Sequence, residues 1–196
     1  MNLPNILTLS RLVFAVVLIY LLHDGSKIAN ILAVIVFTIA SLTDFYDGYL
    51  AKSRGLISNF GKIMDPIADK ALLLSVFGVL ANIGMIAWWI FIVIAIREVL
   101  VTAFRLWAMR QGQVQAAERA GKIKTIVQIV AVSVILLYLV AQQSEYCSSW
   151  FDKFKGMWQS INQSLLLLAV LLTLYSGIDY FRNKFFCHQN DKGLNK

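Results

Sequence analysis

The sequence predicts an all-α, polytopic membrane protein with six transmembrane helices in a single domain, residues 1–196. Composition is the first reason: 59% of the residues are hydrophobic and 15% are charged, whereas soluble domains carry about a quarter charged residues. The second reason is the presence of three uncharged runs, each long enough to cross a bilayer, at 71–96, 125–144 and 156–178. Two further apolar stretches precede them, and the first run with its apolar flanks is divided between two helices, so the count rises to six helices.

Recognisable breaks separate the predicted helices. The first two are divided by the polar turn at 23–26, in which Gly25 suits a helix C-terminus. The run at 71–96 divides at Asn82-Ile83-Gly84, a typical tight turn. The loop at 142–157 has no recognisable motif. In order, the expected helices are 6–22, 28–52, 62–81, 86–109, 118–141 and 158–182.

The net charge of +7 indicates membrane orientation. On a soluble surface such an excess would suggest a nucleic-acid partner, but in a membrane protein it is typical of cytoplasmic loops, so no nucleic-acid partner is expected. Placing both termini in the cytoplasm leaves Lys27, Lys153 and Lys155 outside and most other cations inside. We therefore expect a multi-pass protein of the cell (inner) membrane, surrounded by membrane lipids, with both termini cytoplasmic.

Four aspartates lie close together in the sequence, at Asp44, Asp47, Asp65 and Asp69. Carboxylates in membrane segments are costly and usually functional. Their i, i+3 and i, i+4 spacings put each pair on one helix face, and the connection at 53–60 lets the two helices lie antiparallel. All four can then face one cleft, where they must be protonated, paired with cations or bound to metal.

Metal binding is the simplest of these solutions. An all-oxygen donor set favours Mg²⁺ or Mn²⁺, four carboxylates can bridge two ions, and two-metal sites carry out phosphoryl chemistry. The small residues Gly48, Ala51 and Gly61 would let a bulky phosphorylated ligand approach the backbone. The alternative is a salt network between the aspartates and the cations Lys52, Arg54, Lys62 and Lys70.

The stretch 44–69 resembles the signature of the CDP-alcohol phosphotransferase family, D-x2-D-G-x2-A-R-x8-G-x3-D-x3-D. Seven of its eight fixed positions are present with every gap correct: Asp44, Asp47, Gly48, Ala51, Gly61, Asp65 and Asp69. The departure is Lys52, where the family usually has arginine. Lysine keeps the charge but loses the bidentate phosphate geometry of a guanidinium group.

Other segments between residues 4 and 130 are similar to the branch of this family that makes phosphatidylglycerophosphate. They are Pro4-Asn5 with Thr8 and Arg11, Arg97-Glu98 with Thr102 and Arg105, and 121–125. The resemblance implies a six-helix membrane enzyme, usually a homodimer, with a cytoplasmic site. Its reaction is transfer of the phosphatidyl group from CDP-diacylglycerol to sn-glycerol 3-phosphate, with release of CMP, in phospholipid biosynthesis.

The resemblance also implies roles for individual residues. The four aspartates would hold Mg²⁺ or Mn²⁺, two ions being expected, and Asp69 would also take the proton from the acceptor hydroxyl as general base. The predicted CDP-diacylglycerol site consists of Asn5, Thr8, Gly48, Ala51, Lys52, Ser58 and Gly61.

The acceptor carries a phosphate, so a second cationic pocket is needed. The candidates are Arg97, Arg105 and Lys122; the two arginines are eight residues apart, about 80° in helical projection, and can face one cavity. Glu98 can pair with an interior cation. Alternatively the arginines pair with Glu98 or extend to the interface, and Lys122 and Lys124 only orient the protein.

Two other functions use the same acidic cluster. The first keeps the donor but takes another acceptor, either phosphatidylglycerol, as in a cardiolipin synthase, or inositol phosphate. The second is a divalent-cation transporter. Transport is disfavoured because the acids gather at one face instead of lying deep in the bilayer on several helices.

Overall fold

The structure, a computed structural model, describes residues 3–54, 59–110, 119–143 and 148–193. These residues form six α-helices: α1 (Leu3–Asp24), α2 (Lys27–Arg54), α3 (Asn59–Asn82), α4 (Trp88–Arg110), α5 (Arg119–Gln142) and α6 (Ser148–Gly193). No β-strand occurs within these ranges. The prediction of an all-α chain with six helices is confirmed, and the bounds of the first five agree to within a few residues.

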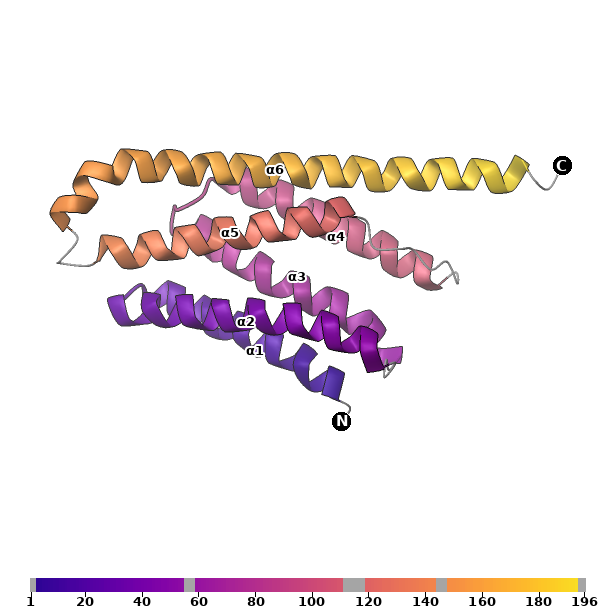
Figure 1. Cartoon of the computed structure of the whole chain (residues 1–196), viewed down its shortest axis with the longest axis horizontal. Helices are drawn as coiled ribbons and strands as arrows, with labels where there is room; N and C mark the ends of the chain where they lie inside the picture. The colour runs from indigo at the N-terminus through magenta and orange to yellow at the C-terminus, as the bar shows by residue number, and fades with distance from the viewer. Residues whose placement is uncertain (1–2, 55–58, 111–118, 144–147, 194–196) are drawn as a thin grey trace.

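The sixth helix is much longer than predicted. It was expected at 158–182, but α6 has 46 residues and includes residues 148–157 of the supposed loop at 142–157. Hydropathy marks only the apolar part of a helix. Beyond Tyr180 the sequence becomes polar but has no proline or glycine before Gly193, so nothing in it stops the helix. Figure 1 shows this end of α6 extending past the other helices.

Both predicted turns are confirmed, and each contains a glycine with positive φ. Gly25 has a φ of 65° between α1 and α2, and Gly84 has a φ of 76° after α3. Other residues adopt this conformation at a steric cost, so glycine ends each helix cleanly. Ser26 then caps α2, because its hydroxyl oxygen accepts a hydrogen bond from the Ala29 amide at 3.2 Å.

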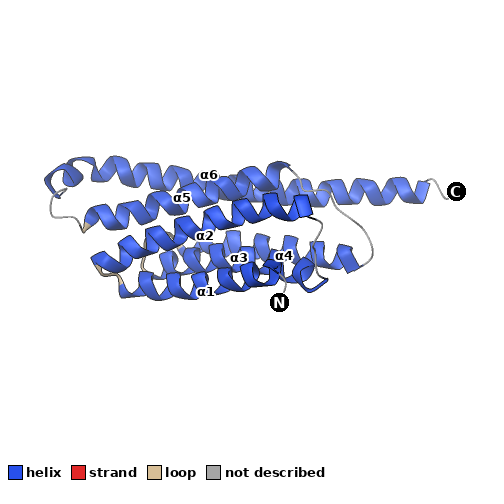
Figure 2. Cartoon of the chain, turned by 60° about the horizontal axis from the view of Figure 1, so that its bottom comes forward, coloured by secondary structure: helices blue, strands red, loops and turns tan. Residues whose placement is uncertain are grey.

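The six helices run alternately up and down the bundle (Figures 1 and 2). At one end, on the right of Figure 1, α2 and α4 end, and α1, α3 and α5 begin. We call this the open-loop end. At the opposite end, the turn end, Asn30 donates to Gln143 at 3.0 Å and Gln143 donates to the Gly25 carbonyl at 2.8 Å, which links α2 to α5.

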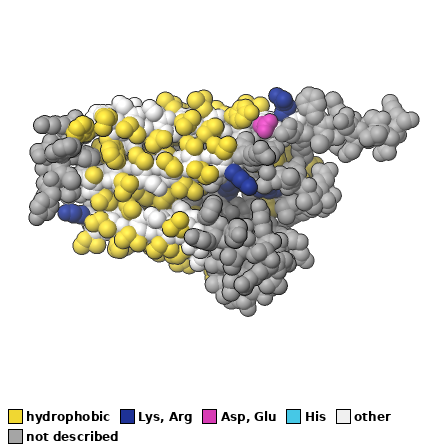
Figure 3. Space-filling model, in the orientation of Figure 1, with side chains coloured by type: hydrophobic (Ala, Val, Ile, Leu, Met, Phe, Trp, Pro, Cys, Tyr) yellow, Lys and Arg dark blue, Asp and Glu magenta, His cyan; other side chains and the backbone are white. Residues whose placement is uncertain are grey.

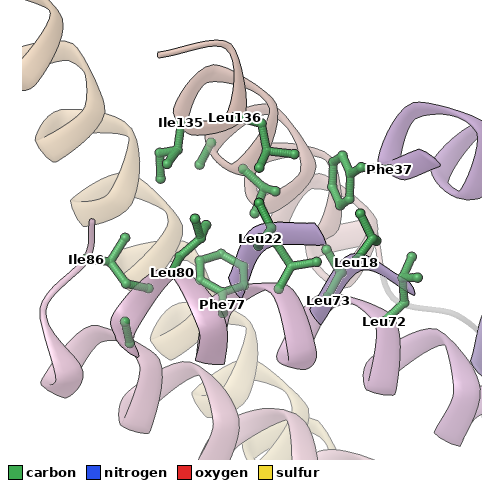
Figure 4. Close-up of a cluster of buried hydrophobic side chains, with 14 of the residues drawn as sticks. Leu18, Leu22, Phe37, Leu72, Leu73, Phe77, Leu80, Ile86, Ile135 and Leu136 are labelled. Atoms are coloured by element: carbon green, nitrogen blue, oxygen red, sulfur yellow. The ribbon is translucent and has the colours of Figure 1, made fainter. Parts of the chain in front are cut away.

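One hydrophobic core receives side chains from all six helices, most of them from α1, α2, α3 and α5. Figure 4 shows Leu18, Phe37, Phe77, Leu80 and Leu136 converging from these helices. α1 packs against both α2 and α3, α2 also packs on α5, α3 on α4, and α6 on α4 and α5. The core therefore holds α1 between the two helices that carry the aspartates.

The outer surface of the bundle is apolar. In Figure 3 the visible face carries a broad area of hydrophobic side chains, and the charged side chains in view lie at the left edge or in the right half. Within the described residues, two helical stretches are long and apolar enough to cross a membrane, Gly121–Gln142 and Gly156–Tyr180. Shorter apolar stretches are Lys27–Thr43 and Lys70–Asn82, so a crossing by all six helices stays a prediction.

Candidate active site

The four aspartates occupy matching levels on two helices. Asp47 is seven residues before the last residue of α2 and Asp65 is six residues after the first residue of α3, so both lie about 10 Å from the open-loop end. Asp44 and Asp69 are each ten residues from the same ends, at about 15 Å. The side chains of all four fall outside the described part of the structure. The helix bounds alone place the aspartates in two layers at one end of the bundle.

The predicted CDP-diacylglycerol residues belong to the same end. Asn5 and Thr8 lie in the first turns of α1, which packs against both aspartate-bearing helices. The predicted residues on α2 and α3 lie in the last turns of α2 or at the start of α3: Gly48, Ala51, Lys52 and Gly61. Ser58 lies outside the described residues, as do the side chains of the others. Their backbone positions put three helices around one prospective donor site.

The three cations predicted for the acceptor phosphate separate into different surroundings. Arg97 is nearly buried in α4, with 12% of its side chain exposed. Arg105, eight residues further along α4, is partly exposed and lies about 12 Å nearer the open-loop end. Lys122 is exposed near the start of α5. Of these three residues, only Arg97 contacts the buried charged cluster around Glu98 in the part of the chain that the structure describes.

Glu98 is the centre of that cluster, which contains cations from three helices. Its carboxylate lies 3.0 Å from the Lys70 ammonium of α3 and 3.4 Å from Nη1 of Arg97, and it accepts a hydrogen bond from the Lys124 ammonium of α5. The Glu98 side chain is 4% exposed and that of Lys124 is 1% exposed. The prediction that Glu98 pairs with an interior cation is confirmed.

Arg97 is also held by α6. Its Nη2 donates to the Ser176 hydroxyl, and its aliphatic stem lies against the next residue, Gly177. A Cβ atom built on Gly177 would be 3.4 Å from Cγ of Arg97, so the glycine lets the arginine lie directly on the α6 backbone. Contacts to α6 and to Glu98 together fix the direction of the guanidinium group.

Lys124 and Lys70 are the residues of this cluster that sequence reasoning missed. For Lys124, the alternative that it only orients the protein is wrong, because the residue is fully buried in an ion pair; the exposed Lys122 still fits that role. Periodicity could not reveal a contact between α3, α4 and α5. The available signal was Glu98 itself, because a carboxylate inside a membrane segment requires a cation.

The donor set of the aspartate layers fits a divalent metal. The described side chains contain no group of three or more His, Cys, Asp or Glu that could hold an ion, and the aspartate side chains are not among them. Four carboxylates on two helices, at two adjacent levels, supply the hard oxygen ligands that Mg²⁺ and Mn²⁺ prefer. The four aspartates are therefore suited to binding a divalent metal ion.

Comparison with known proteins identifies the family. Residues 1–175 match the model of the CDP-alcohol phosphatidyltransferase family. The chain belongs to this family. It is 35% identical over 192 residues to the CDP-diacylglycerol–glycerol-3-phosphate 3-phosphatidyltransferase of Bacillus subtilis, covering 92% of this chain and 93% of the relative. It is 36% identical over 182 residues to a probable phosphatidylglycerophosphate synthase of Mycobacterium tuberculosis, covering 91% of this chain and 79% of the relative.

A third relative is the CDP-diacylglycerol–glycerol-3-phosphate 3-phosphatidyltransferase of Rickettsia typhi, 32% identical over 181 residues, or 92% of this chain and 96% of the relative. Membership of the CDP-alcohol phosphatidyltransferase family makes the chain a membrane-integral phosphatidyltransferase, and enzymes of this family use a divalent metal ion. The resemblance seen in residues 44–69 is thereby confirmed.

Proposed function

We propose that this CDP-alcohol phosphatidyltransferase transfers the phosphatidyl group of CDP-diacylglycerol to sn-glycerol 3-phosphate and releases CMP, a step of phospholipid biosynthesis. One structural observation carries the proposal: α4 and α5 bring a buried group of cations to the side of α3, the helix that contains Asp65 and Asp69. A cationic cluster beside the proposed phosphoryl-transfer site suits an acceptor that itself carries a phosphate. The names of the three relatives support the same acceptor.

The proposed setting is the cell (inner) membrane. The apolar outer surface of the bundle supports a crossing by all six helices, with the open-loop end in the cytoplasm, where both predicted substrate sites lie. Water-soluble glycerol 3-phosphate would enter from this side, and the lipid donor would enter laterally from the bilayer. We also propose a homodimer, as the family resemblance implies.

The proposed chemistry assigns roles to residues at that end. Asp44, Asp47, Asp65 and Asp69 would hold one or two Mg²⁺ or Mn²⁺ ions, which when bound neutralise the pyrophosphate and the departing CMP. Asp69 takes the proton from the acceptor hydroxyl. Lys52 supplies positive charge to the donor phosphates. The remaining predicted donor-site residues line the CDP moiety: Asn5, Thr8, Gly48, Ala51, Ser58 and Gly61.

The acceptor phosphate would meet Arg97, Arg105 and Lys122. Arg97 is the best supported of the three, because its guanidinium group is fixed on both sides by Glu98 and Ser176. Arg105 and Lys122 lie nearer the open-loop end, where the acceptor would enter. In this arrangement all three cations contact the acceptor phosphate, with Arg105 and Lys122 on the side from which it enters.

Charge reversal at Arg105 tests this assignment. For Arg105→Glu we expect KM for glycerol 3-phosphate to rise about 10-fold to 100-fold. A charge-assisted hydrogen bond to phosphate contributes about 1.5–3 kcal/mol, which corresponds to this range. KM for CDP-diacylglycerol should change little. Steady-state CMP release, with each substrate varied in turn, measures both constants.

A matched control is Arg182→Glu, which reverses an exposed arginine of α6 outside the predicted site and should leave both constants unchanged. If Arg105→Glu behaves like this control, Arg105 does not contact the acceptor phosphate. Full activity of the variant with phosphatidylglycerol, but not with glycerol 3-phosphate, would instead favour the cardiolipin synthase reaction.

A further inference from the structure

Glu98 joins three helices through one carboxylate. Oε2 lies 3.0 Å from the ammonium of Lys70, and Oε1 accepts from Lys124 and lies 3.4 Å from Arg97. Lys70 belongs to α3 and Lys124 to α5, whereas Arg97 precedes Glu98 in α4. Glu98 is therefore the shared partner of all three cations.

The exposure of the three cations follows a gradient. The side chain of Lys124 is 1% exposed, that of Arg97 is 12% exposed and that of Lys70 is 27% exposed. The surfaces of Lys70 and Arg97 can therefore be touched by a ligand, whereas Lys124 is covered. Lys124 has a different role, because its fully buried charge holds the Glu98 carboxylate in one orientation.

The charges in this described cluster favour an anion. It contains three cations and one carboxylate, and charges removed from water in a membrane protein need close compensation. A phosphate monoester carries about −1.5 to −2 charges at neutral pH, which matches the surplus. Lys70 also directly follows Asp69 in α3, so the cluster lies at the same level of this helix as the proposed general base.

We propose that Glu98 is a positioning residue of the acceptor site: its carboxylate, fixed by Lys124, holds Lys70 and Arg97 in the arrangement that receives the acceptor's phosphate. The inference rests on the proposed function and adds three residues to it, Glu98, Lys70 and Lys124. Glu98 itself does not touch the substrate. Ser176 is a second support, because its hydroxyl oxygen accepts from Arg97 on the side of α6.

Glu98→Gln tests this proposal in the full-length protein in detergent or vesicles. The amide keeps the size of the side chain but removes the negative charge that holds the Lys70 ammonium and the Arg97 guanidinium group in place. We expect KM for sn-glycerol 3-phosphate to rise at least 10-fold, while KM for CDP-diacylglycerol changes less than about 2-fold. Glu98→Asp keeps the charge and should recover part of the loss. Equal changes in both KM values, or no change, would overturn the proposal.

Two further variants keep the test decisive if Glu98→Gln does not fold. Ser176→Ala removes one hydroxyl and should raise KM for glycerol 3-phosphate about 3-fold to 10-fold with kcat unchanged. Gln128→Leu is the control, since Gln128 of α5 is 1% exposed and donates to Thr173 at 3.3 Å, which is also a contact to α6 but lies outside the cluster. It should leave both KM values unchanged. Identical behaviour of the two variants would reduce the cluster to a structural contact.

A double-mutant cycle separates positioning from independent binding. If Glu98 acts by placing Lys70, then Glu98→Gln combined with Lys70→Met should raise KM for glycerol 3-phosphate little more than the larger single change. Multiplication of the two single effects would contradict the proposal. Absence of CMP release by the unmodified protein with glycerol 3-phosphate would instead refute the proposed function, which distinguishes the two failures.

Discussion

Asp69→Asn is expected to lower kcat for CMP release by about 100-fold to 10,000-fold, the usual contribution of a general base. Asparagine keeps an oxygen donor and nearly the same shape but cannot accept the proton of the acceptor hydroxyl. Binding of CDP-diacylglycerol should persist, because donor binding does not require this proton transfer. Turnover at saturating substrates and stabilisation of the purified variant by CDP-diacylglycerol measure the two effects separately.

Asp24→Asn is a matched control for this substitution. Asp24 is an exposed aspartate at the turn end of the bundle, where its carboxylate accepts a hydrogen bond from Ser26 at 2.6 Å. An asparagine there can still accept that bond, so activity should stay at the unmodified level. Turnover of Asp69→Asn equal to that of Asp24→Asn would remove Asp69 from the role of general base.

Asp47→Asn and Asp65→Asn are expected to abolish activity at every concentration of Mg²⁺ or Mn²⁺. Each change replaces a charged ligand by a neutral one at the same level of the bundle, where the proposed ions bind. Stabilisation of transition-state charge by a metal contributes several kcal/mol, so the loss should reach at least about 1,000-fold. CMP release measured over a titration of each metal gives the result.

Asp179→Asn provides the comparison, because Asp179 is a partly exposed aspartate of α6 and lies outside the signature. It should keep both its activity and its metal requirement. Near-normal turnover of either signature variant, with an unchanged metal dependence, would show that these aspartates do not hold the ions.

Most of the fold could be predicted because apolar runs and glycine turns act locally. Gly25 and Gly84 adopt positive φ at the breaks that the sequence indicates. These breaks set the bounds of the helices on either side of them. The end of α6 could not be placed by hydropathy, since a polar segment without proline or glycine continues as a helix outside the apolar part. Its length depends on the absence of a stop signal before Gly193.

In the candidate site, too, some features could be predicted from the sequence and others could not. The aspartates are recognisable because their spacing within two neighbouring helices is itself the signal, and the helix bounds place them at matching levels. The contacts of Glu98 with Lys70 and Lys124 join helices that are separated in the sequence, so they depend on packing. No periodicity within one helix could have selected the buried Lys124 over the exposed Lys122.

The central claim is a metal-dependent transfer to an acceptor that carries a phosphate. The most direct test is CMP release by the purified protein with CDP-diacylglycerol and Mg²⁺ or Mn²⁺, comparing sn-glycerol 3-phosphate with glycerol, inositol phosphate and phosphatidylglycerol. The account predicts metal-dependent release with glycerol 3-phosphate alone. Release only with another acceptor would contradict the acceptor assignment, and no release with any of the four would contradict the proposed reaction.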